Sequence, residues 1–519
     1  MHTDSPLHPH RWKALVVLAL SLLVVTVDNT ILNVALPTIR SELDASSSEL
    51  QWIVDSYLLV FAGLLLAAGT LGDRFGRRRA LFVGLAIFFV GSLLAALSGG
   101  STALIASRAL MGVGGAAIMP TTLSIISNIF PAHERPKAIA VWAAVAGLGV
   151  AIGPTTGGFL IEHFAWSSVF LVNLPVIVVC LVAGAILIPE SRDPASPRID
   201  VAGVVLSIAG LTAVVWGLIE APERGWTSGT ILLAFGGGAA ILAAFVAWER
   251  RCDEPMLDVD VFRNLRFSAA SASVTFVFFA LMGVMYFLTT YLQSVLGYSA
   301  LQAGVRTLPV AAGVIVATRL SVGLTRRFGT KVMVASGLGM VAGALGLLAT
   351  VDGGSGYGLV AAALSQMGIG MGLTMAPATD AIMGTLPKEK AGVGSAMNDV
   401  GREVGGTLGV AVLGSVLSSG YASGMSGATD GLPAGAAAVA SDSVGAAHEV
   451  AADIGGGLGA SLIASADAAF IDAMATAAAV GAGAAAMGAL VALAFLPARP
   501  GRDPDEARTL PPEMVPAPA

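Results

Sequence analysis

The sequence predicts an all-α membrane protein with fourteen transmembrane helices. Of its 519 residues, 55% are hydrophobic and 12% are charged, whereas soluble proteins carry roughly 25% charged residues. The mean hydropathy is +0.81. Fourteen apolar runs are each long enough, at ~20 residues, to cross ~30 Å of hydrocarbon. The basic residues also gather in alternate loops, as they do in membrane proteins.

The apolar runs follow one another with short polar loops between them. In chain order they span 14–37, 51–71, 80–98, 102–130, 138–161, 168–189, 201–220, 229–248, 267–292, 301–323, 332–350, 357–384, 392–419 and 466–496.

Charge placement gives the orientation. Of 28 Lys and Arg residues, only Arg40 and Arg224 fall in the predicted loops of the opposite side. By the positive-inside rule, both termini are predicted to be cytoplasmic.

Two related loops predict two repeated halves. The loop after the second run contains Gly72-Asp73-Arg74-Phe75-Gly76, and 323–331 repeats its pattern without the acid. Transporter folds commonly contain such repeats. The predicted parts are an N-terminal tail (1–13), a six-helix bundle (14–190), an inserted helix pair with its flanking loops (191–266), a second six-helix bundle (267–496) that includes a flexible outer loop (421–465), and a C-terminal tail (497–519).

The fifth run contains a stripe of small residues. Gly149, Gly153 and Gly157 recur every four residues, so they form one bare face that another helix can approach closely. Pro154 removes a backbone donor and bends the helix. Gly158 follows the stripe directly.

These segments carry a family resemblance. The loop with Asp73, Arg74 and Arg77 resembles the loop signature of the major facilitator superfamily, and the fourth run resembles a second motif, which holds Arg108 inside the membrane. The stripe in the fifth run resembles the motif of antiporters. The runs that contain Asp28 and Asp55 resemble the fourteen-helix drug:proton antiporter branch.

The resemblance implies two six-helix bundles around a central cavity that opens alternately to the two sides. It implies a proton-coupled exporter of lipophilic, often cationic, small molecules, with Asp73 and the arginines beside it as a latch on the cytoplasmic side. The expected proton-coupling residues are Asp28, Asp55 and Glu403; the charge partners or gating residues are Arg108, Asp73, Arg74, Arg77 and Arg402; the antiporter motif comprises Gly149, Gly153, Pro154, Gly157 and Gly158; and the candidates for the substrate cavity are Asp28, Asn33, Asp55 and Asn398.

Several of these residues are predicted to lie at the same depth in the membrane. At 1.5 Å per residue, Asp28, Asp55, Arg108 and Pro154 all lie about 21–24 Å above the cytoplasmic edge. Charged groups inside a membrane are costly and mark functional positions. We therefore expect one level of the outer half to hold two carboxylates and a guanidinium.

The thirteenth run offers a second group of charges. Asp399 and Arg402 are three residues apart, so a local ion pair is available to them. Glu403 is either part of this structural pairing or a second proton site, and the sequence leaves both open.

No phosphate-binding loop of the type G-x-x-x-x-G-K-[ST] occurs in the sequence, so ATP is not expected to drive the protein from within its own chain. The resemblance implies the proton gradient as the energy source, with no cofactor. His133, His163 and His448 are isolated in the sequence, so no metal site is expected. The expected partners are a small-molecule substrate, protons and the lipid bilayer, without nucleic acid, for a monomer in a bacterial plasma membrane. Three alternatives remain: a dedicated exporter of a self-made metabolite, a proton-symport nutrient importer, and a non-transporting scaffold or sensor.

Overall fold

A computed structural model describes residues 10–131, 134–192, 200–253, 255, 257, 259–385 and 391–496. Within these ranges the only regular secondary structure is helical. In the part of the chain that the structure describes, thirteen helical segments are long and apolar enough to cross a membrane. The 29-residue α5, at the fifth predicted run, is not counted among these thirteen. The predicted all-α membrane fold is confirmed. Residues 1–9 and 497–519 of the two predicted tails lie outside the described ranges.

The N-terminal bundle contains seven helical segments that form six spans, because α6 and α7 together make the sixth. They are α1 (Arg11–Leu43), α2 (Ser47–Phe75), α3 (Arg77–Ala96), α4 (Ser101–Ile129), α5 (Arg135–His163), α6 (Ser168–Leu171) and α7 (Asn173–Leu187).

Local sequence fixes the turns of this bundle. Asp44 ends α1 in the left-handed conformation, and Ser46 with Glu49 forms a capping box that starts α2. Gly76, with φ of 122°, makes the turn between α2 and α3. Glycine tolerates this φ because it has no Cβ.

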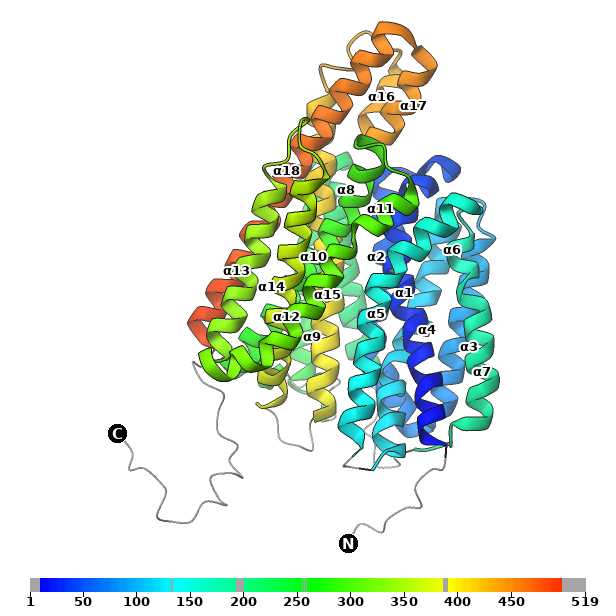
Figure 1. The fold of residues 1–519 in the computed structure, drawn as a ribbon, viewed down its shortest axis with the longest axis vertical. Helices are drawn as coiled ribbons and strands as arrows, with labels where there is room; N and C mark the ends of the chain where they lie inside the picture. Colours follow the sequence, from blue (N-terminus) through cyan, green and yellow to red (C-terminus); the bar gives the residue numbers. More distant parts are fainter. Residues whose placement is uncertain are drawn as a thin grey trace.

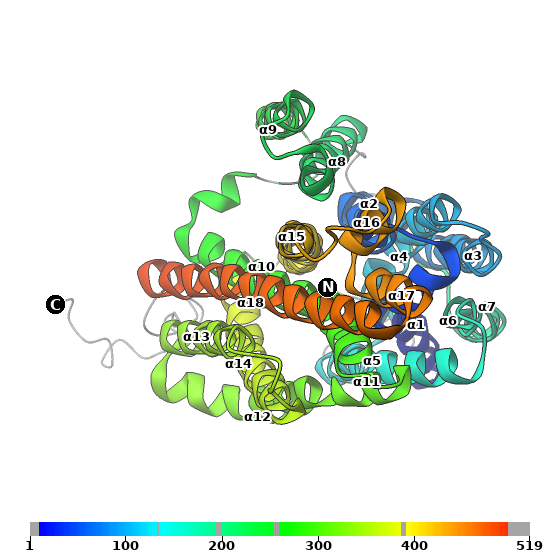
Figure 2. The same cartoon turned by 90° about the horizontal axis from the view of Figure 1, so that it is seen from above.

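A helix pair separates the two bundles in the chain: α8 (Val201–Arg224) and α9 (Gly229–Glu249). Seen from above, the pair stands at the periphery, with α8 toward the rest of the molecule and α9 outside it (Figure 2). α8 packs against α2 and α15, and α9 packs mainly on α8. Most of α9 is exposed, as expected for a helix that faces lipid.

The C-terminal bundle carries the remaining helices. They are η1 (Val259–Arg263), α10 (Leu265–Thr290), η2 (Tyr291–Val295), α11 (Ala300–Arg306), α12 (Leu308–Phe328), α13 (Thr330–Leu348), α14 (Tyr357–Met383), α15 (Ala391–Met425), α16 (Ala434–Asp442), α17 (Val444–Ile454) and α18 (Gly456–Phe495).

The predicted flexible loop 421–465 is helical, so that prediction is wrong. α15 extends to Met425, and α16 and α17 form a cap above the bundles (Figure 1). α18 has 40 residues and is therefore about 60 Å long, about twice the hydrocarbon thickness. The segment is rich in alanine, the strongest helix former, and buried Val444 and Ala447 pack the cap onto its neighbours.

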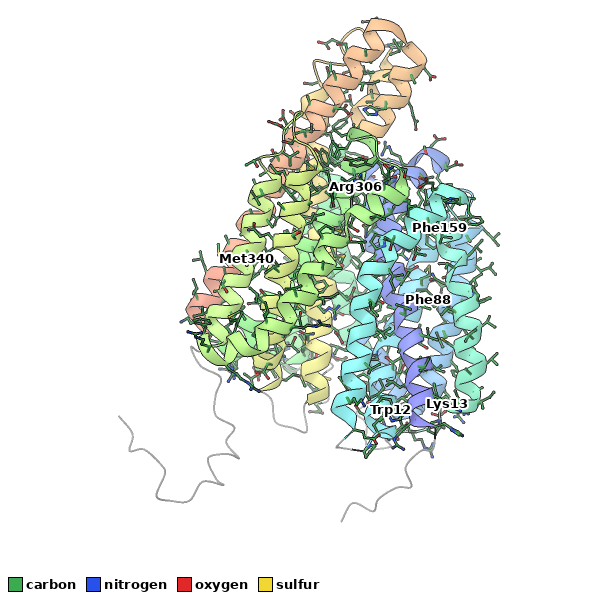
Figure 3. The ribbon with its side chains drawn as sticks, viewed as in Figure 1. Trp12, Lys13, Phe88, Phe159, Arg306 and Met340 are labelled. Atoms are coloured by element: carbon green, nitrogen blue, oxygen red, sulfur yellow. The ribbon has the colours of Figure 1, made fainter. Side chains whose placement is uncertain are left out.

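α1 begins and α18 ends at the same end of the molecule, opposite the cap (Figure 1). Trp12 and Lys13 lie at that end, and Arg306 lies near the other (Figure 3). The ring of Trp12 packs edge-on against Phe130 and lies 5.3 Å from Lys137 Nζ. An aromatic ring beside basic groups is typical of a membrane interface.

Two seams join the bundles. On one side α5 packs against α11, and on the other α2 packs against α15, where α8 also lies. The site residues described below lie inside the N-terminal bundle and along these seams.

Candidate functional site

A buried ion pair joins α1 and α4. Asp28 is fully buried and Arg108 is 1% exposed. Arg108 Nη1 donates to Asp28 Oδ2 at 2.5 Å. Two charges leave water together only when good geometry and further hydrogen bonds compensate for lost hydration. The sequence predicted that both residues lie at one depth, and the structure makes them partners.

Further groups complete this pair. Arg108 Nε donates to the Ile53 carbonyl at 3.1 Å, and its guanidinium carbon lies 4.4 Å from the Tyr57 ring centroid. Asn173 Nδ2 donates to Asp28 Oδ1 at 3.1 Å. Asn173 was not among the residues predicted from the sequence. The available signal was a single amide side chain in an otherwise apolar run, and such a group needs a partner once it is buried.

The pair lies about halfway along the N-terminal bundle. Tyr57 packs edge-on against Phe88 with ring centroids 6.4 Å apart, and Phe88 lies near the middle of this bundle (Figure 3). The pair is therefore remote from water at either end.

Asp55 has a different environment from Asp28, although both were predicted at the same depth. It is fully buried, and neither carboxylate oxygen has a hydrogen-bond partner among the described residues. Asp55 is one turn from Gln51 on α2, so the two share a face. The Gln51 amide lies beside Gly414 of α15. Asp55 thus points along the face that α2 presents to the second bundle.

The predicted charges of the second half lie together on α15. Arg402 Nη1 is 3.7 Å from Asp399 Oδ1, and its guanidinium carbon lies 4.7 Å from the Phe278 ring centroid. Asn398 Oδ1 accepts a hydrogen bond from Thr379 at 3.2 Å. Glu403 follows Arg402 directly and is half-buried.

The glycine stripe of α5 faces α1. Any Cβ added at Gly149 or Gly153 would collide with the hydroxyl of Thr26 or Thr30, and at Gly157 it would lie 2.8 Å from the Ile31 carbonyl oxygen. The stripe therefore lets two helices of the same bundle approach closely.

Gly158 instead faces the other bundle. A Cβ there would lie 2.5 Å from the Ala300 carbonyl oxygen on α11, and a Cβ at Gly304 of α11 would collide with the carbonyl of Pro154. The carbonyl that Pro154 presents thus lies in the α5–α11 seam. This short motif serves two contacts: one within the bundle and one between bundles.

Hydrogen bonds between the bundles lie at the cap side. Thr289 donates to the Asn33 carbonyl at 2.7 Å, Gln293 to the Val34 carbonyl at 3.0 Å, and Ser299 to Glu162 at 3.0 Å. Within the described residues, no side-chain hydrogen bond joins the bundles at the opposite end. The structure is thus closed on the cap side.

A cavity lies below this closure, between α1, α5, α10 and α12. Only about 20 Å³ of it is open to the centre of a water-sized molecule, which is room for about one or two waters and far less than the volume of a small-molecule site. Its walls are mainly apolar, with Met282 and Met285 on one side and Thr30, Asn33 and Pro154 on the other. Among the predicted cavity residues Asn33 lines this space, whereas Asp28, Asp55 and Asn398 do not.

The loop with Asp73 forms a network at the end opposite the cap. Asp73 Oδ1 accepts from Arg77 Nε at 2.6 Å and from Ser124 Oγ at 2.8 Å. Arg74 is exposed, with its guanidinium carbon 5.8 Å from the Phe75 ring centroid. These contacts join α2, α3 and α4 within one bundle.

The part of the chain that the structure describes holds no group of three or more His, Cys, Asp or Glu residues that could bind a metal ion. Separately, the buried carboxylates and arginines described above can exchange protons and ion-pair partners.

Residues 18–410 match the Major Facilitator Superfamily. The multidrug efflux pump LfrA of Mycolicibacterium smegmatis is 39% identical over 76% of this chain and 79% of its own length. The tetracenomycin C resistance and export protein of Streptomyces glaucescens is 35% identical over 78% of this chain and 76% of its own length.

The fold also resembles a solved structure. A bacterial homolog of the human lysosomal transporter Spinster, in an inward-facing and unoccupied conformation, matches 95% of this chain and 99% of its own with a TM-score of 0.66. At 17% identity this likeness concerns the fold alone.

Proposed function

This chain belongs to the major facilitator superfamily and is a transporter rather than an enzyme, and on this premise we propose that it exports drug-like molecules in exchange for protons. The substrates would be lipophilic, often cationic, small molecules that leave the cytoplasm by alternating access. The named relatives are an efflux pump and a resistance and export protein, which supports this class of substrate.

The buried pair of Asp28 and Arg108 supports the proposed coupling. When the molecule is open outward, a proton that reaches Asp28 neutralises the carboxylate and releases Arg108. When it is open inward, the carboxylate loses this proton and binds Arg108 again. Because an unpaired buried charge costs several kcal/mol, each protonation step changes which arrangement of α1 and α4 is stable.

Asp55 would be the second proton carrier. A buried carboxylate without a partner costs much free energy when it is charged, so we propose that Asp55 holds a proton in the conformation described here. Its place on α2 opposite α15 links this proton to the contact between the bundles. Glu403 remains a third candidate, next to the pair formed by Asp399 and Arg402.

A cationic substrate and a proton would compete for the same negative charge. Substrate that enters from the cytoplasm would have to widen the narrow cavity lined by Met282 and Met285, whose flexible thioether side chains can move to fit varied apolar shapes. Binding of a cation nearby favours loss of the proton. Inward proton movement is thereby coupled to outward movement of substrate.

We place the protein in a bacterial plasma membrane, as a monomer with both termini in the cytoplasm. Under the positive-inside rule the arginine-rich turn after α2 is cytoplasmic, so the cap lies outside. The closed side is then the outer side, and the structure faces inward.

Substitution of Asp28 tests the coupling. Asn is nearly isosteric with Asp but cannot titrate, whereas Glu retains the titrating group. In inverted vesicles, Asp28→Asn should abolish proton-driven transport, and Asp28→Glu should retain part of it with a shifted pH optimum. Purified wild type should release protons when substrate binds. Well-folded Asp28→Asn protein that still releases protons would refute the assignment and move the proton site to Asp55 or Glu403.

Dedicated export of a self-made metabolite is the second candidate, because one named relative is a resistance and export protein for a single antibiotic. A panel of unrelated lipophilic cations separates the two functions. Transport of several of these cations favours multidrug efflux. Transport of none of them, together with transport of a single other compound such as tetracenomycin C, favours the dedicated exporter.

A further inference from the structure

Polar side chains form a line along one face of α2, which starts beneath the cap and ends at Asp55. Ser47, Gln51 and Asp55 are spaced four residues apart, so they lie on successive turns of the same face. Gln51 is 1% exposed and Asp55 is fully buried. The line therefore runs for about 12 Å from the outer end of α2 into the interior of the protein.

The second bundle covers this line. A Cβ added at Gly414 of α15 would lie 2.8 Å from Gln51 Nε2. A Cβ at Gly406 of the same helix would lie 3.7 Å from Leu58 Cδ1. Asp55 lies between Gln51 and Leu58 along α2, so its side chain is at a level between these two contacts. Leu58 is buried and fills the seam on the inner side of Asp55.

A small cavity beneath the cap reaches the outer end of the line. About 80 Å³ of it is open to the centre of a water-sized molecule, which is room for about five waters and too little for a drug-sized ligand. Ser47 and Tyr286 are in its wall, and so is Glu449 of α17, which is exposed to solvent. The cavity therefore opens to the outer solvent beside Glu449 and meets the line at Ser47.

Tyr286 of α10 connects the cavity with the inner part of the line. Its ring atom Cε1 lies 3.2 Å from the position of a Cβ added at Gly414, next to the Gln51 amide. Its Oη donates to the Ser47 carbonyl at 3.3 Å, and Tyr286 also interacts electrostatically with Asp55. A phenol hydroxyl can both donate and accept a hydrogen bond, so this group can take part in a chain of proton transfers.

Three buried acceptors on the line indicate bound water. Gln51 Oε1 and both carboxylate oxygens of Asp55 have no hydrogen-bond partner within the described residues. Buried polar atoms that lack a protein partner are commonly paired with ordered water. A water between the two side chains can donate one hydrogen bond to each of them.

The other charged groups on the helices around Asp55 are paired or lie at a distance from it. The paired groups are Asp28 with Arg108, Arg40 with Asp442, Glu220 with Arg224, and Asp399 with Arg402. Glu403 of α15 lies three residues inward of Gly406, beyond Leu58, and the charged residues of α3 and α10 are in the first turns of these helices, at the inner end. The line thus leads to a single carboxylate.

We propose that Asp55 receives its proton from the outer side along this line while the seam is closed to substrate. The proton passes from solvent through water in the cavity and through Tyr286 Oη. Each oxygen accepts one proton as it gives up another, so the net change is one proton added to the Asp55 carboxylate. Gln51 holds the last water and carries no proton itself, which makes it a positioning residue. The inference rests on the proposed function in taking Asp55 as a proton carrier.

Carbodiimide labelling of Asp55 in the full-length protein tests this route. Dicyclohexylcarbodiimide adds to a buried carboxyl group only when the group is protonated, and mass spectrometry of the peptide that contains Asp55 gives the labelling rate. The reagent crosses the membrane, so only the two pH values have sides. In right-side-out vesicles, the outer pH is varied at a fixed inner pH, and then the inner pH at a fixed outer pH. We expect labelling to fall as the outer pH rises, by up to about tenfold per pH unit, and to be independent of the inner pH.

Three substitutions test the residues of the line. Gln51→Leu keeps the size of the side chain but removes the amide, and it should abolish the dependence on outer pH, whereas Gln51→Asn should retain part of it. Tyr286→Phe should also abolish it, and serves as the second variant if Gln51→Leu folds poorly. Ser56→Ala is the matched control, because Ser56 Oγ of the same helix donates to the Ile105 carbonyl inside the first bundle. It should label as wild type does.

Labelling in wild type that ignores the outer pH, or that follows the inner pH, would overturn the route. An unchanged dependence in both Gln51→Leu and Tyr286→Phe would overturn the assignment of these residues. Proton-driven transport, assayed separately, distinguishes this proposal from the proposed function. Transport without labelling that follows the outer pH contradicts the route alone, whereas such labelling without transport contradicts the exporter alone.

Discussion

Gly158 allows a direct test of how the seam between α5 and α11 controls the conformation of the protein. A Cβ at this position would lie 2.5 Å from backbone atoms of Ala300 and Leu301 on α11, whereas ordinary contact begins at 3.4 Å. The added methyl group is thus about 0.9 Å too close. Backbone atoms have no rotamers with which to avoid it, so Gly158→Ala must move α5 and α11 apart.

The cost falls on the outward-closed conformation alone, because this contact exists only while the seam is closed. Overpacking of a well-packed contact costs about 1–3 kcal/mol. Such a difference shifts a two-state equilibrium by about 5- to 150-fold. We expect Gly158→Ala to raise the outward-open population by a factor in this range.

The assay is labelling of Met285→Cys, in the wall of the cavity beneath the closed seam, by an impermeant thiol reagent applied to right-side-out vesicles. Gly158→Ala should accelerate labelling. Gly153→Ala is the matched control, since its new methyl group meets Thr30 inside the N-terminal bundle. It should lower thermal stability without accelerating labelling. An unchanged labelling rate in well-folded Gly158→Ala protein would refute the proposed control by the seam.

Three further predictions address the cap, the buried pair and the topology. Arg40→Ala removes the partner of Asp442 and should increase protease cleavage of the cap. Because the pair is partly exposed, the free energy of unfolding should fall by only about 1 kcal/mol. A cap that resists protease as in wild type would show that this ion pair does not hold it in place. Asn173→Leu leaves one carboxylate oxygen of Asp28 without its hydrogen-bond donor, and the loss of this buried hydrogen bond costs about 1–3 kcal/mol. The substitution should therefore shift the pH profile of transport. An unchanged pH profile would show that the Asn173 amide is dispensable. Cys252 should react with an impermeant maleimide in inside-out but not in right-side-out vesicles, and the reverse result would invert the proposed orientation.

Individual residues show how much of the candidate site can be predicted from the sequence. Asp28, Asp55 and Arg108 were predicted at one depth, and Asp28 and Arg108 do form a pair. Depth follows from the fixed rise per residue of a helix. The choice of Asp28 rather than Asp55 as the partner depends on which way each helix face points, and that is set by packing between helices far apart in the chain.

The cap shows a different limit. Composition suggested a flexible loop for 421–465, because glycine and serine are common there. The alanines favour helix, but a short helix is marginal in water without a surface to pack against. Only the fold supplies that surface, through α18 and the pairing of Asp442 with Arg40.

The sequence by itself determined the all-α membrane fold, because hydrocarbon thickness and the cost of buried charge act on each apolar run separately. It also identified the glycines of α5 as a packing stripe. Only the tertiary structure decided that Gly158 faces α11 while Gly153 faces α1, that Asn173 reaches Asp28, and that the cap covers a cavity with Glu449 in its wall. These facts depend on contacts between segments up to about 400 residues apart, and no local pattern encodes the angle at which two helices meet.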